Sequence, residues 1–397
     1  MLRLIPPVAA PVRVSQLAAS LVHRRDASAP GFAALLARRS GMPRCTLFGS
    51  GRAALTAFLR GCALDGHDEV VLPAYTCWSV PASVVRAGLR VRLVDVDPYA
   101  LGPDPDEVAA AIGSRTAAVI AAHLLGPSVD VAAVVRACRS RRPDVPIVED
   151  AAQAWPEGGS VADAVLLSFG RGKPLALGSG GALCGREETD GPGTRRGGWI
   201  DAGALGATLL LSRPGWFRLP ESVPALAIGE TSYEPGFALD RPFHDWQETL
   251  GARLLPSLPA LDALRSTNAR RLAPYVESVS GWTVAAPGRA PGPLRLPVLA
   301  PDRARRDHVL AALRRRGVSG SAMYPGSIDR IPELRGQLFD ERHDFPGARA
   351  LAERLLTLPV YPFLRGADVV AIGEAFEHAA GRGDALQPAA TSVERRP

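Results

Sequence analysis

Lys173 is the only lysine among the 397 residues, and every other one of the 46 basic residues is arginine. It lies in the stretch Ser168-Phe-Gly-Arg-Gly-Lys173-Pro-Leu-Ala-Leu-Gly-Ser-Gly-Gly-Ala182. Arginine stays protonated and cannot form an imine, whereas a desolvated lysine amine can do so. An isolated lysine is usually a solvated charge, but a serine on one side and a glycine cluster on the other favour covalent chemistry. The pattern predicts Lys173 as a reactive amine.

A carboxylate at the end of an apolar run is the second candidate. Val145-Pro-Ile-Val-Glu149-Asp150 has the composition of a strand that ends in two carboxylates, with Gln153 shortly after it. Capping of a following helix is the alternative role for Asp150. At the carboxyl end of a parallel strand, Asp150 would face the ligand crevice. There it would hold a heterocyclic nitrogen protonated, because a negative charge raises the pKa of a neighbouring cation. A pyridoxal ring becomes an electron sink in this way.

Phe48-Gly49-Ser50-Gly51-Arg52 joins a predicted strand to a predicted helix. The free N–H groups and the positive dipole end of that helix suit a phosphate, although a plain tight turn is equally consistent with the glycines. A nucleotide-binding P-loop is excluded, since Leu167 and Pro174 stand where that motif needs glycine and serine or threonine. An imine-forming lysine, a carboxylate and a helix N-terminus together predict a pyridoxal 5'-phosphate site. His123 is expected to pack at a strand end without a catalytic role.

Composition excludes several other classes of protein. The net charge of +6 comes from scattered arginines without interleaved aromatic residues, so we expect no nucleic-acid partner. The five cysteines form no CxxC or metal-ligand spacing, which predicts reduced thiols, a cytoplasmic location and no metal site. No apolar run reaches the roughly 18 residues of a membrane helix, and prolines interrupt the N-terminus, so neither a membrane span nor a signal peptide is expected.

The elements that must position these residues alternate between strand and helix. Seven apolar runs have strand length: Cys45–Phe48, Glu69–Leu72, Val91–Val96, Ala117–Ala122, Val145–Val148, Val165–Ser168 and Ala182–Cys184. Four helical patterns lie between the earlier runs: Ala53–Cys62, Val80–Ala87, Pro105–Ile112 and Val131–Arg139. Two more helices precede them, around Ser15–Val22 and Phe32–Arg38. This alternation predicts a doubly covered, mostly parallel sheet.

The remainder of the chain predicts a second, smaller unit. Residues 185–241 have no clear period and are expected to form a lid or an interface. A long helical pattern with proline breaks then covers Trp246–Val276. After it come strand Leu294–Leu299, helix Arg303–Arg316, a loop around Met323-Tyr324-Pro325, helix Gly347–Leu356 and helix Val369–Ala379. We expect a large cofactor-binding domain over 1–255, including an N-terminal arm. A small α/β domain over 256–397 would end in a disordered tail from Gln387.

Across nearly its whole length the sequence resembles the DegT/StrS-type sugar aminotransferases of pyridoxal-phosphate fold type I. The Asp150–Gln153 and Ser168–Lys173 spacings are the specific part of the resemblance. The other matching stretches are Ser50-Gly51-Arg52-Ala53-Ala54-Leu55, Asp68-Glu69-Val70-Val71-Leu72-Pro73, Gly88 with Val94-Asp95-Val96-Asp97, Thr116-Ala117-Ala118-Val119-Ile120, Gly178-Ser-Gly180-Gly181 and Leu358-Pro359-Val360-Tyr361-Pro362.

The resemblance implies a role for each candidate residue. Lys173 would form the imine with the cofactor, Asp150 would hold the pyridine nitrogen, and Gln153 would lie beside the ring hydroxyl. Ser168 and the backbone around Gly51 and Arg52 would hold the phosphate. The resemblance also implies a homodimer with sites at the subunit interface.

Two stretches depart from the family pattern. Members usually place an aromatic residue after the threonine of Pro-x-x-Thr, where it stacks on the cofactor ring; here Cys77 follows Thr76, and Trp78 comes one place later. We expect Cys77 to meet the ring and Trp78 to pack elsewhere, because neighbouring strand residues face opposite ways. Members also carry a Gly-x-Asn-x-Arg motif that reaches the partner's cofactor. Near its expected place this chain has only Arg241 to supply the charge.

The resemblance implies transfer of an amino group from an amino acid, glutamate being the first expectation, to a keto sugar that is nucleotide-linked. Such reactions serve amino-sugar or polysaccharide biosynthesis. Two alternatives remain open. A sugar dehydratase on the same fold is one, although the family's dehydratases replace the lysine with histidine. A non-catalytic regulatory protein that keeps a bound cofactor is the other.

Overall fold

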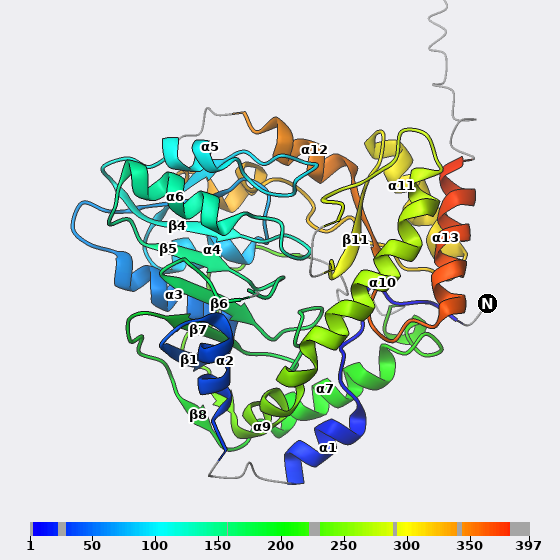
Figure 1. Ribbon diagram of the computed structural model, residues 1–397, viewed down its shortest axis with the longest axis horizontal. Helices are drawn as coiled ribbons and strands as arrows, with labels where there is room; N and C mark the ends of the chain where they lie inside the picture. The colour runs from blue at the N-terminus through cyan, green and yellow to red at the C-terminus, as the bar shows by residue number, and fades with distance from the viewer. Residues whose placement is uncertain are drawn as a thin grey trace, which may run out of the picture.

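A mixed seven-stranded sheet forms the centre of the larger part of the computed structural model (Figure 1). The structure describes residues 3–22, 29–156, 158–221, 231–288, 292–339 and 344–381. The strands are β1 (Arg44–Phe48), β2 (Glu69–Pro73), β3 (Arg90–Val94), β4 (Thr116–Ala122), β5 (Ile147–Asp150), β6 (Ala164–Ser168) and β7 (Gly181–Gly185), in the order β1-β7-β6-β5-β4-β2-β3. Only β7 runs antiparallel to its neighbours. All seven predicted strands are confirmed, as is the fold class.

Helices cover both faces of this sheet, and the residues of β4 show how. Ala118, Ile120 and Ala122 pack in the layer that contains α3 (Gly51–Cys62) and α4 (Ser79–Arg86). Val119 and Ala121 face the opposite layer, with α5 (Pro105–Ala110) and α6 (Val131–Arg141). Alternate side chains of a strand point to opposite faces, so a doubly covered strand is apolar throughout. This is why the strands appear in the sequence as unbroken apolar runs.

A further apolar cluster packs on β1, β6 and β7, on the sheet face that α5 and α6 cover farther along, and Phe32, Phe169 and Phe243 meet at its centre. Its helices are α1 (Val14–Val22), α2 (Phe32–Ser40), α7 (Trp199–Leu211) and α9 (Asp245–Leu254). The region 185–241, for which no element was predicted, contains α7, α8 (Arg218–Glu221) and the short strand β8 (Thr194–Arg195), which pairs with β9 (Phe243–His244).

The second unit is built on a three-stranded antiparallel sheet of β10 (Thr283–Val284), β11 (Arg295–Leu299) and β12 (Leu355–Pro359). Its helices are α10 (Leu258–Glu277), α11 (Arg303–Arg315), α12 (Pro346–Arg354) and α13 (Gly366–Gly381). Three one-turn helices complete the described elements: η2 (Leu255–Ser257), η3 (Ile328–Arg330) and η4 (Pro332–Leu334). In Figure 1, α10 runs diagonally from α9 towards this sheet. The predicted domain boundary at residue 255 falls between α9 and α10 and stays a prediction.

One predicted helix end is wrong. The helix expected to run to Leu356 ends at Arg354, and Leu355–Pro359 forms β12 instead. Pairing of every residue of β12 with β11 stabilises the extended conformation despite the helical pattern before it. The disordered tail expected from Gln387 lies outside the described residues. Among the helices that the structure describes, none is both long and apolar enough to cross a membrane.

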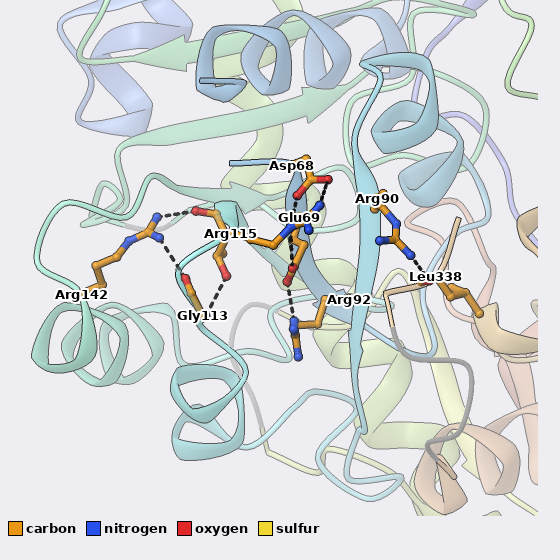
Figure 2. Close-up of polar contacts among 9 residues, drawn as sticks. Asp68, Glu69, Arg90, Arg92, Gly113, Arg115, Arg142 and Leu338 are labelled. Atoms are coloured by element: carbon orange, nitrogen blue, oxygen red, sulfur yellow. Dashed lines mark hydrogen bonds and ion pairs between the residues drawn. The ribbon is translucent and has the colours of Figure 1, made fainter. Parts of the chain in front are cut away.

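An ion-pair cluster closes the amino ends of β2, β3 and β4 (Figure 2). Glu69 is buried at the start of β2, with Nε of Arg92 2.8 Å and Nε of Arg115 3.6 Å from its carboxylate oxygens. Arg115 also binds Asp68 and lowers the pKa of that carboxyl. A buried carboxylate needs such partners to offset its desolvation. Because this cluster satisfies Glu69 at the sheet edge opposite the strands' carboxyl ends, its role is structural.

Candidate active site

Lys173 lies at the carboxyl end of β6, in the loop that returns to β7, and it lines a cavity of about 910 Å³. Four parts of the chain form this cavity, one of them the segment after α7, which contributes Phe217 and Arg218. The N-terminal arm contributes Pro7 and Val8, the larger sheet's loops contribute Cys77 and Gln153, and the smaller unit contributes Arg295, Met323 and Tyr324. The arm is held in place by Ile5, whose N–H donates to Gly317 O at 2.8 Å. The lysine therefore opens into a space between the two sheets, as expected for a ligand site in an α/β fold.

Asp150 is the last residue of β5, and it is buried. Burial raises the pKa of its carboxyl, while the N–H of Ala152, 2.9 Å from Oδ1, and the charge of Lys173 act in the lowering direction. Asp150 and Lys173 thus influence each other electrostatically. No helix starts between β5 and β6 within the described residues, so the helix-capping role considered for Asp150 is wrong.

The carboxylate of Asp150 makes no ion pair with any described residue, and its desolvation is offset only in part. A protonated ring nitrogen would supply the missing cation. The donor set around Lys173 therefore fits pyridoxal phosphate. The role of Asp150 toward that nitrogen stays a prediction.

The residues predicted to hold the phosphate lie close together, and that role stays a prediction. Ser50 caps α3, its Oγ accepting from Ala53 N at 3.1 Å, and α3 begins at Gly51. An ideal Cβ on Gly51 would lie 3.3 Å from Oγ of Ser168, so the serine hydroxyl adjoins the helix N-terminus. Helix N-terminal N–H groups and a hydroxyl suit a phosphate. The guanidinium of Arg52 lies 4.8 Å from the centre of the Phe237 ring. Only the backbone N–H of Arg52 is therefore assigned to the predicted phosphate site.

Gln153 connects the two units. Its Oε1 accepts from Leu125 N at 3.3 Å, and its Nε2 donates to the hydroxyl of Tyr324 at 2.7 Å. Tyr324 lies beside Tyr75, with ring centroids 5.5 Å apart, and burial raises the pKa of its hydroxyl. The sequence analysis placed Tyr324 in a loop and assigned it no role. A tyrosine in a loop gives no sequence signal for a functional site. Only the tertiary contact between Tyr324 and Gln153 shows that Tyr324 belongs to this one.

Cys77 lines the cavity, whereas Trp78 packs away from it, with Nε1 3.3 Å from Gly326 O and its ring against Ile328 and Ile331. Trp78 packs elsewhere as expected, and the contact of Cys77 with the cofactor ring stays a prediction, but the reason given for the two directions is wrong. β2 ends at Pro73, so Cys77 and Trp78 lie in a loop before α4 and do not alternate as strand neighbours.

His123 packs at the end of β4 as expected. Its Nδ1 accepts from Ser128 N and Val129 N at 3.2 Å, which leaves Nε2 to donate to Glu149 Oε1 at 3.2 Å. Arg241 lies 3.5 Å from the carboxylate of Asp201, outside the Lys173 cavity. Its expected approach to a partner subunit's cofactor stays a prediction.

Two residues of the cavity wall have a left-handed backbone. Leu125 has φ 61° and Met323 has φ 62°, and both line the cavity with Lys173. A bulky side chain at positive φ costs about 1–3 kcal/mol and persists only when its surroundings impose it. Two of the four non-glycine residues with a left-handed backbone, among those that the structure describes, therefore line the site.

Comparison with known proteins agrees with this site. A 2-deoxy-scyllo-inosose aminotransferase of Streptomyces lividus that uses L-glutamine is 30% identical over 61% of this chain, and the match spans 54% of that relative, about half its length. A pleiotropic regulatory protein of Geobacillus stearothermophilus is 26% identical over 80% of both chains. The crystal structure of DesI in the presence of its TDP-sugar product superposes with a TM-score of 0.72 at 21% identity, covering 96% of this chain and 94% of DesI.

The model of the DegT/DnrJ/EryC1/StrS aminotransferase family matches residues 13–191 and 236–377. The match confirms the resemblance and, with it, pyridoxal phosphate as the cofactor of this fold. It includes each predicted site residue, from Gly51 to Lys173, without testing their individual roles. The chain belongs to the DegT/DnrJ/EryC1/StrS aminotransferase family.

Proposed function

We propose that the protein is an aminotransferase that moves an amino group from an amino acid to a keto sugar, and that this sugar is nucleotide-linked. One observation carries the proposal: the chain's only lysine lines a cavity between the two sheets, and its charge acts on Asp150, a buried carboxylate without an ion-pair partner among the described residues. An amine for covalent attachment and an anion for a ring nitrogen are the two groups that transamination requires.

When bound, pyridoxal phosphate supplies an electron sink for the carbanion that forms at the substrate carbon. Lys173 holds the cofactor through Nζ and, once released, moves the proton that the substrate carbon loses or gains. Asp150 keeps the ring nitrogen protonated. Gln153 would lie beside the ring hydroxyl, and Ser168 with the N–H groups of Gly51 and Arg52 would hold the phosphate. Cys77 contributes a small wall on the ring face, where an aromatic side chain would otherwise stack.

Charge in the outer part of the cavity supports an anionic acceptor. Arg171, Arg218, Arg314 and Arg315 line it and are exposed, against the single carboxylate of Glu221, which lies 3.3 Å from Arg314. Such arginines suit phosphates, because a guanidinium binds phosphate oxygens with paired N–H groups. The TDP-sugar product of DesI, a protein of the same fold, supports the same substrate class.

We also infer a homodimer located in the cytoplasm. Large apolar side chains are exposed along α7 and the segment after it: Trp199, Ile200, Leu210, Trp216 and Leu219. Several large exposed apolar side chains along one segment are typical of an interface. The five cysteines are all free, which supports a reducing compartment.

Two half-reactions test the proposal. The purified protein loaded with pyridoxal phosphate should lose its visible absorbance when mixed with L-glutamate or L-glutamine. Addition of a keto sugar should then restore the absorbance. A nucleotide-linked 4-keto-6-deoxy sugar and free 2-deoxy-scyllo-inosose, the substrate in the name of the Streptomyces lividus relative, distinguish the two acceptor classes. Recovery with the free cyclitol alone would refute the nucleotide link but leave transamination standing.

A non-catalytic regulatory protein is the second candidate, and the Geobacillus stearothermophilus relative is the observation that favours it. A regulator would keep the cofactor's visible absorbance unchanged through an amino-donor panel at millimolar concentration. An enzyme would lose it within one turnover. A dehydratase would instead eliminate water from the sugar, which mass spectrometry of the sugar detects as a loss of 18 Da, about the mass of one water molecule, without consumption of an amino acid.

A further inference from the structure

Arg295 is half-buried, whereas the other four arginines of the cavity wall, among the lining residues that the structure describes, are exposed. It starts β11 of the smaller sheet, and its side chain reaches across to the lysine loop. Nη2 lies 3.7 Å from the position of an ideal Cβ on Gly172, the residue before Lys173. Nη1 lies 3.5 Å from Sδ of Met323. The guanidinium therefore faces the inner part of the cavity, next to the reactive amine.

No carboxylate of the described residues pairs with this guanidinium. Its recorded polar neighbours are a thioether sulfur and the hydroxyl of Tyr324, both uncharged. Burial lowers the pKa of Arg295, because surrounding protein atoms replace part of the water around its guanidinium. By contrast, the buried Arg265 pairs with Asp262. A desolvated cation without a counter-ion is unfavourable, so the inner cavity is prepared for an anion.

The distance of an anionic group from the reacting carbon indicates which substrate carries the anion that Arg295 would bind. In an amino acid the α-carboxylate is bonded directly to the carbon that carries the amino group, so it must lie next to Lys173 during transfer. A keto sugar is neutral around its carbonyl carbon, and any phosphate it carries is several bonds away, within reach of the exposed outer arginines. A guanidinium beside the lysine loop thus matches a carboxylate, which it binds with two parallel N–H groups.

We propose that Arg295 binds the α-carboxylate of the amino donor and so determines that the first substrate is an α-amino acid. This proposal rests on the proposed aminotransferase function. It makes Arg295 a specificity residue of the donor half-reaction, with no part in the binding of the keto-sugar acceptor.

The test compares donors that differ only in the α-carboxylate. L-glutamine and its decarboxylated analogue 4-aminobutanamide are mixed with cofactor-loaded wild type and Arg295→Gln, and the loss of visible absorbance is followed against concentration. We expect Arg295→Gln to raise the half-saturating concentration of L-glutamine about 10- to 100-fold, as for a lost charge-assisted hydrogen bond. The slow reaction with 4-aminobutanamide should change by less than about 2-fold. L-glutamate and 4-aminobutanoate serve as a second pair.

Arg295→Lys keeps the charge without the planar fork and should give an intermediate increase. The melting temperature of Arg295→Gln and its borohydride labelling at Lys173 show whether that variant folds. If it does not fold, Arg295→Lys still tests the proposal. Arg303→Gln removes an exposed arginine from the start of α11, outside the cavity, and should behave as wild type.

The outcomes separate the two proposals. If wild type and Arg295→Gln react equally well with L-glutamine or L-glutamate, only the proposed role of Arg295 is overturned. Equal losses toward the amino acid and its decarboxylated analogue would also overturn it, since they indicate a general structural role. Wild type that consumes no amino donor would overturn the aminotransferase proposal and the Arg295 proposal together.

Discussion

Gly181 approaches Gly51 so closely that an ideal Cβ on Gly181 would lie 2.4 Å from the backbone nitrogen of Gly51. The contact joins the first residue of β7 to the first residue of α3, and the neighbouring pair Ser50 and Gly180 forms a β-bridge. A side chain at residue 181 would displace the N–H groups proposed to hold the cofactor phosphate. Within the glycine cluster after Lys173, this contact accounts for Gly181, whereas an ideal Cβ on Gly180 would lie 2.5 Å from the ring of Phe243.

Gly181→Ala should therefore weaken binding of pyridoxal phosphate at least about 10-fold, because backbone atoms have no flexible end that can move aside. Titration of the apoprotein with pyridoxal phosphate, followed by visible absorbance, measures this. Gly203→Ala is the matched control: Gly203 lies in α7, and an ideal Cβ there would meet no atom within 4 Å. That variant should bind the cofactor as wild type does and gain roughly 0.5–1 kcal/mol of helix stability. Equal cofactor affinities of wild type and Gly181→Ala would remove α3 from the phosphate site.

Asp150→Asn should lower transamination by about 10²-fold or more, since the ring nitrogen would lose its preorganised counter-ion in a water-poor site. Its Oδ1 can still accept from Ala152 N, so the loop should keep its conformation. Single-turnover loss of absorbance with L-glutamate measures the effect. Near-normal turnover with cofactor still bound would exclude Asp150 from the mechanism.

The same substitution should stabilise the apoprotein at neutral pH. The folded-state pKa of Asp150 lies above its usual value of 3.8, because burial disfavours the charged form. Below pH 3.8 the Asp150 carboxyl is protonated in both the folded and the unfolded state, so it does not lower the free energy of unfolding. As the pH rises through the raised folded-state pKa, the wild type loses stability and Asp150→Asn does not. We therefore expect the melting temperature of apo Asp150→Asn to exceed that of wild type at pH 8 and the difference to shrink towards pH 4. A difference that grows on acidification would contradict this sign.

The sheet was predictable from the sequence because each strand carries its own signal. Residues of β4 such as Val119 and Ile120 are buried on opposite faces, and the unbroken apolar run records this. The helix α7 was missed because it has few of the usual local signals: Gly198 provides no side-chain cap, and Gly203 and Gly206 interrupt it. It forms because Leu205 and Leu209 pack into the layer around Phe32.

The site was predictable only where its residues are close in sequence. Lys173 follows Ser168 by five positions, and Gln153 follows Asp150 by three, so these spacings are visible in the chain. Arg295 and Tyr324 come from the smaller unit, more than a hundred residues later, and reach Gly172 and Gln153 only after the two units pack together. No local pattern records a contact of that kind.

The proposed dimer predicts a mass by light scattering of about twice the 41.8 kDa chain mass in the presence of cofactor. Ile200 is 88% exposed and Trp216 is 59% exposed. A charge at either position should therefore change the stability of the monomer little, but it should weaken association strongly if the residue is buried in a dry interface. Ile200→Asp should shift the protein towards monomer. Val370→Asp changes a similarly apolar residue, 45% exposed on α13, and should remain dimeric. A wild type that is fully active as a monomer at assay concentration would contradict the dimer.

The most direct test uses the single lysine. Reduction of the cofactor-loaded protein with borohydride should fix pyridoxal phosphate on Nζ of Lys173 as a stable secondary amine. The α-amino group of Met1 is the only other primary amine of the unmodified chain. Trypsin should cut after Arg171, and it should not cut after a modified lysine that precedes Pro174, so the label should lie in one peptide from Gly172 to Arg186.

Lys173→Arg should lose both the label and transamination while it keeps the positive charge, because a guanidinium forms no imine. The retained charge near Asp150 makes this variant the control for electrostatics, and an unchanged melting temperature would show that the fold survives. Peptide mass spectrometry locates the label, and single-turnover absorbance measures the activity. A label found only on Met1, or a Lys173→Arg protein that still transaminates, would show that the lysine is not the attachment point and that the proposed chemistry is wrong.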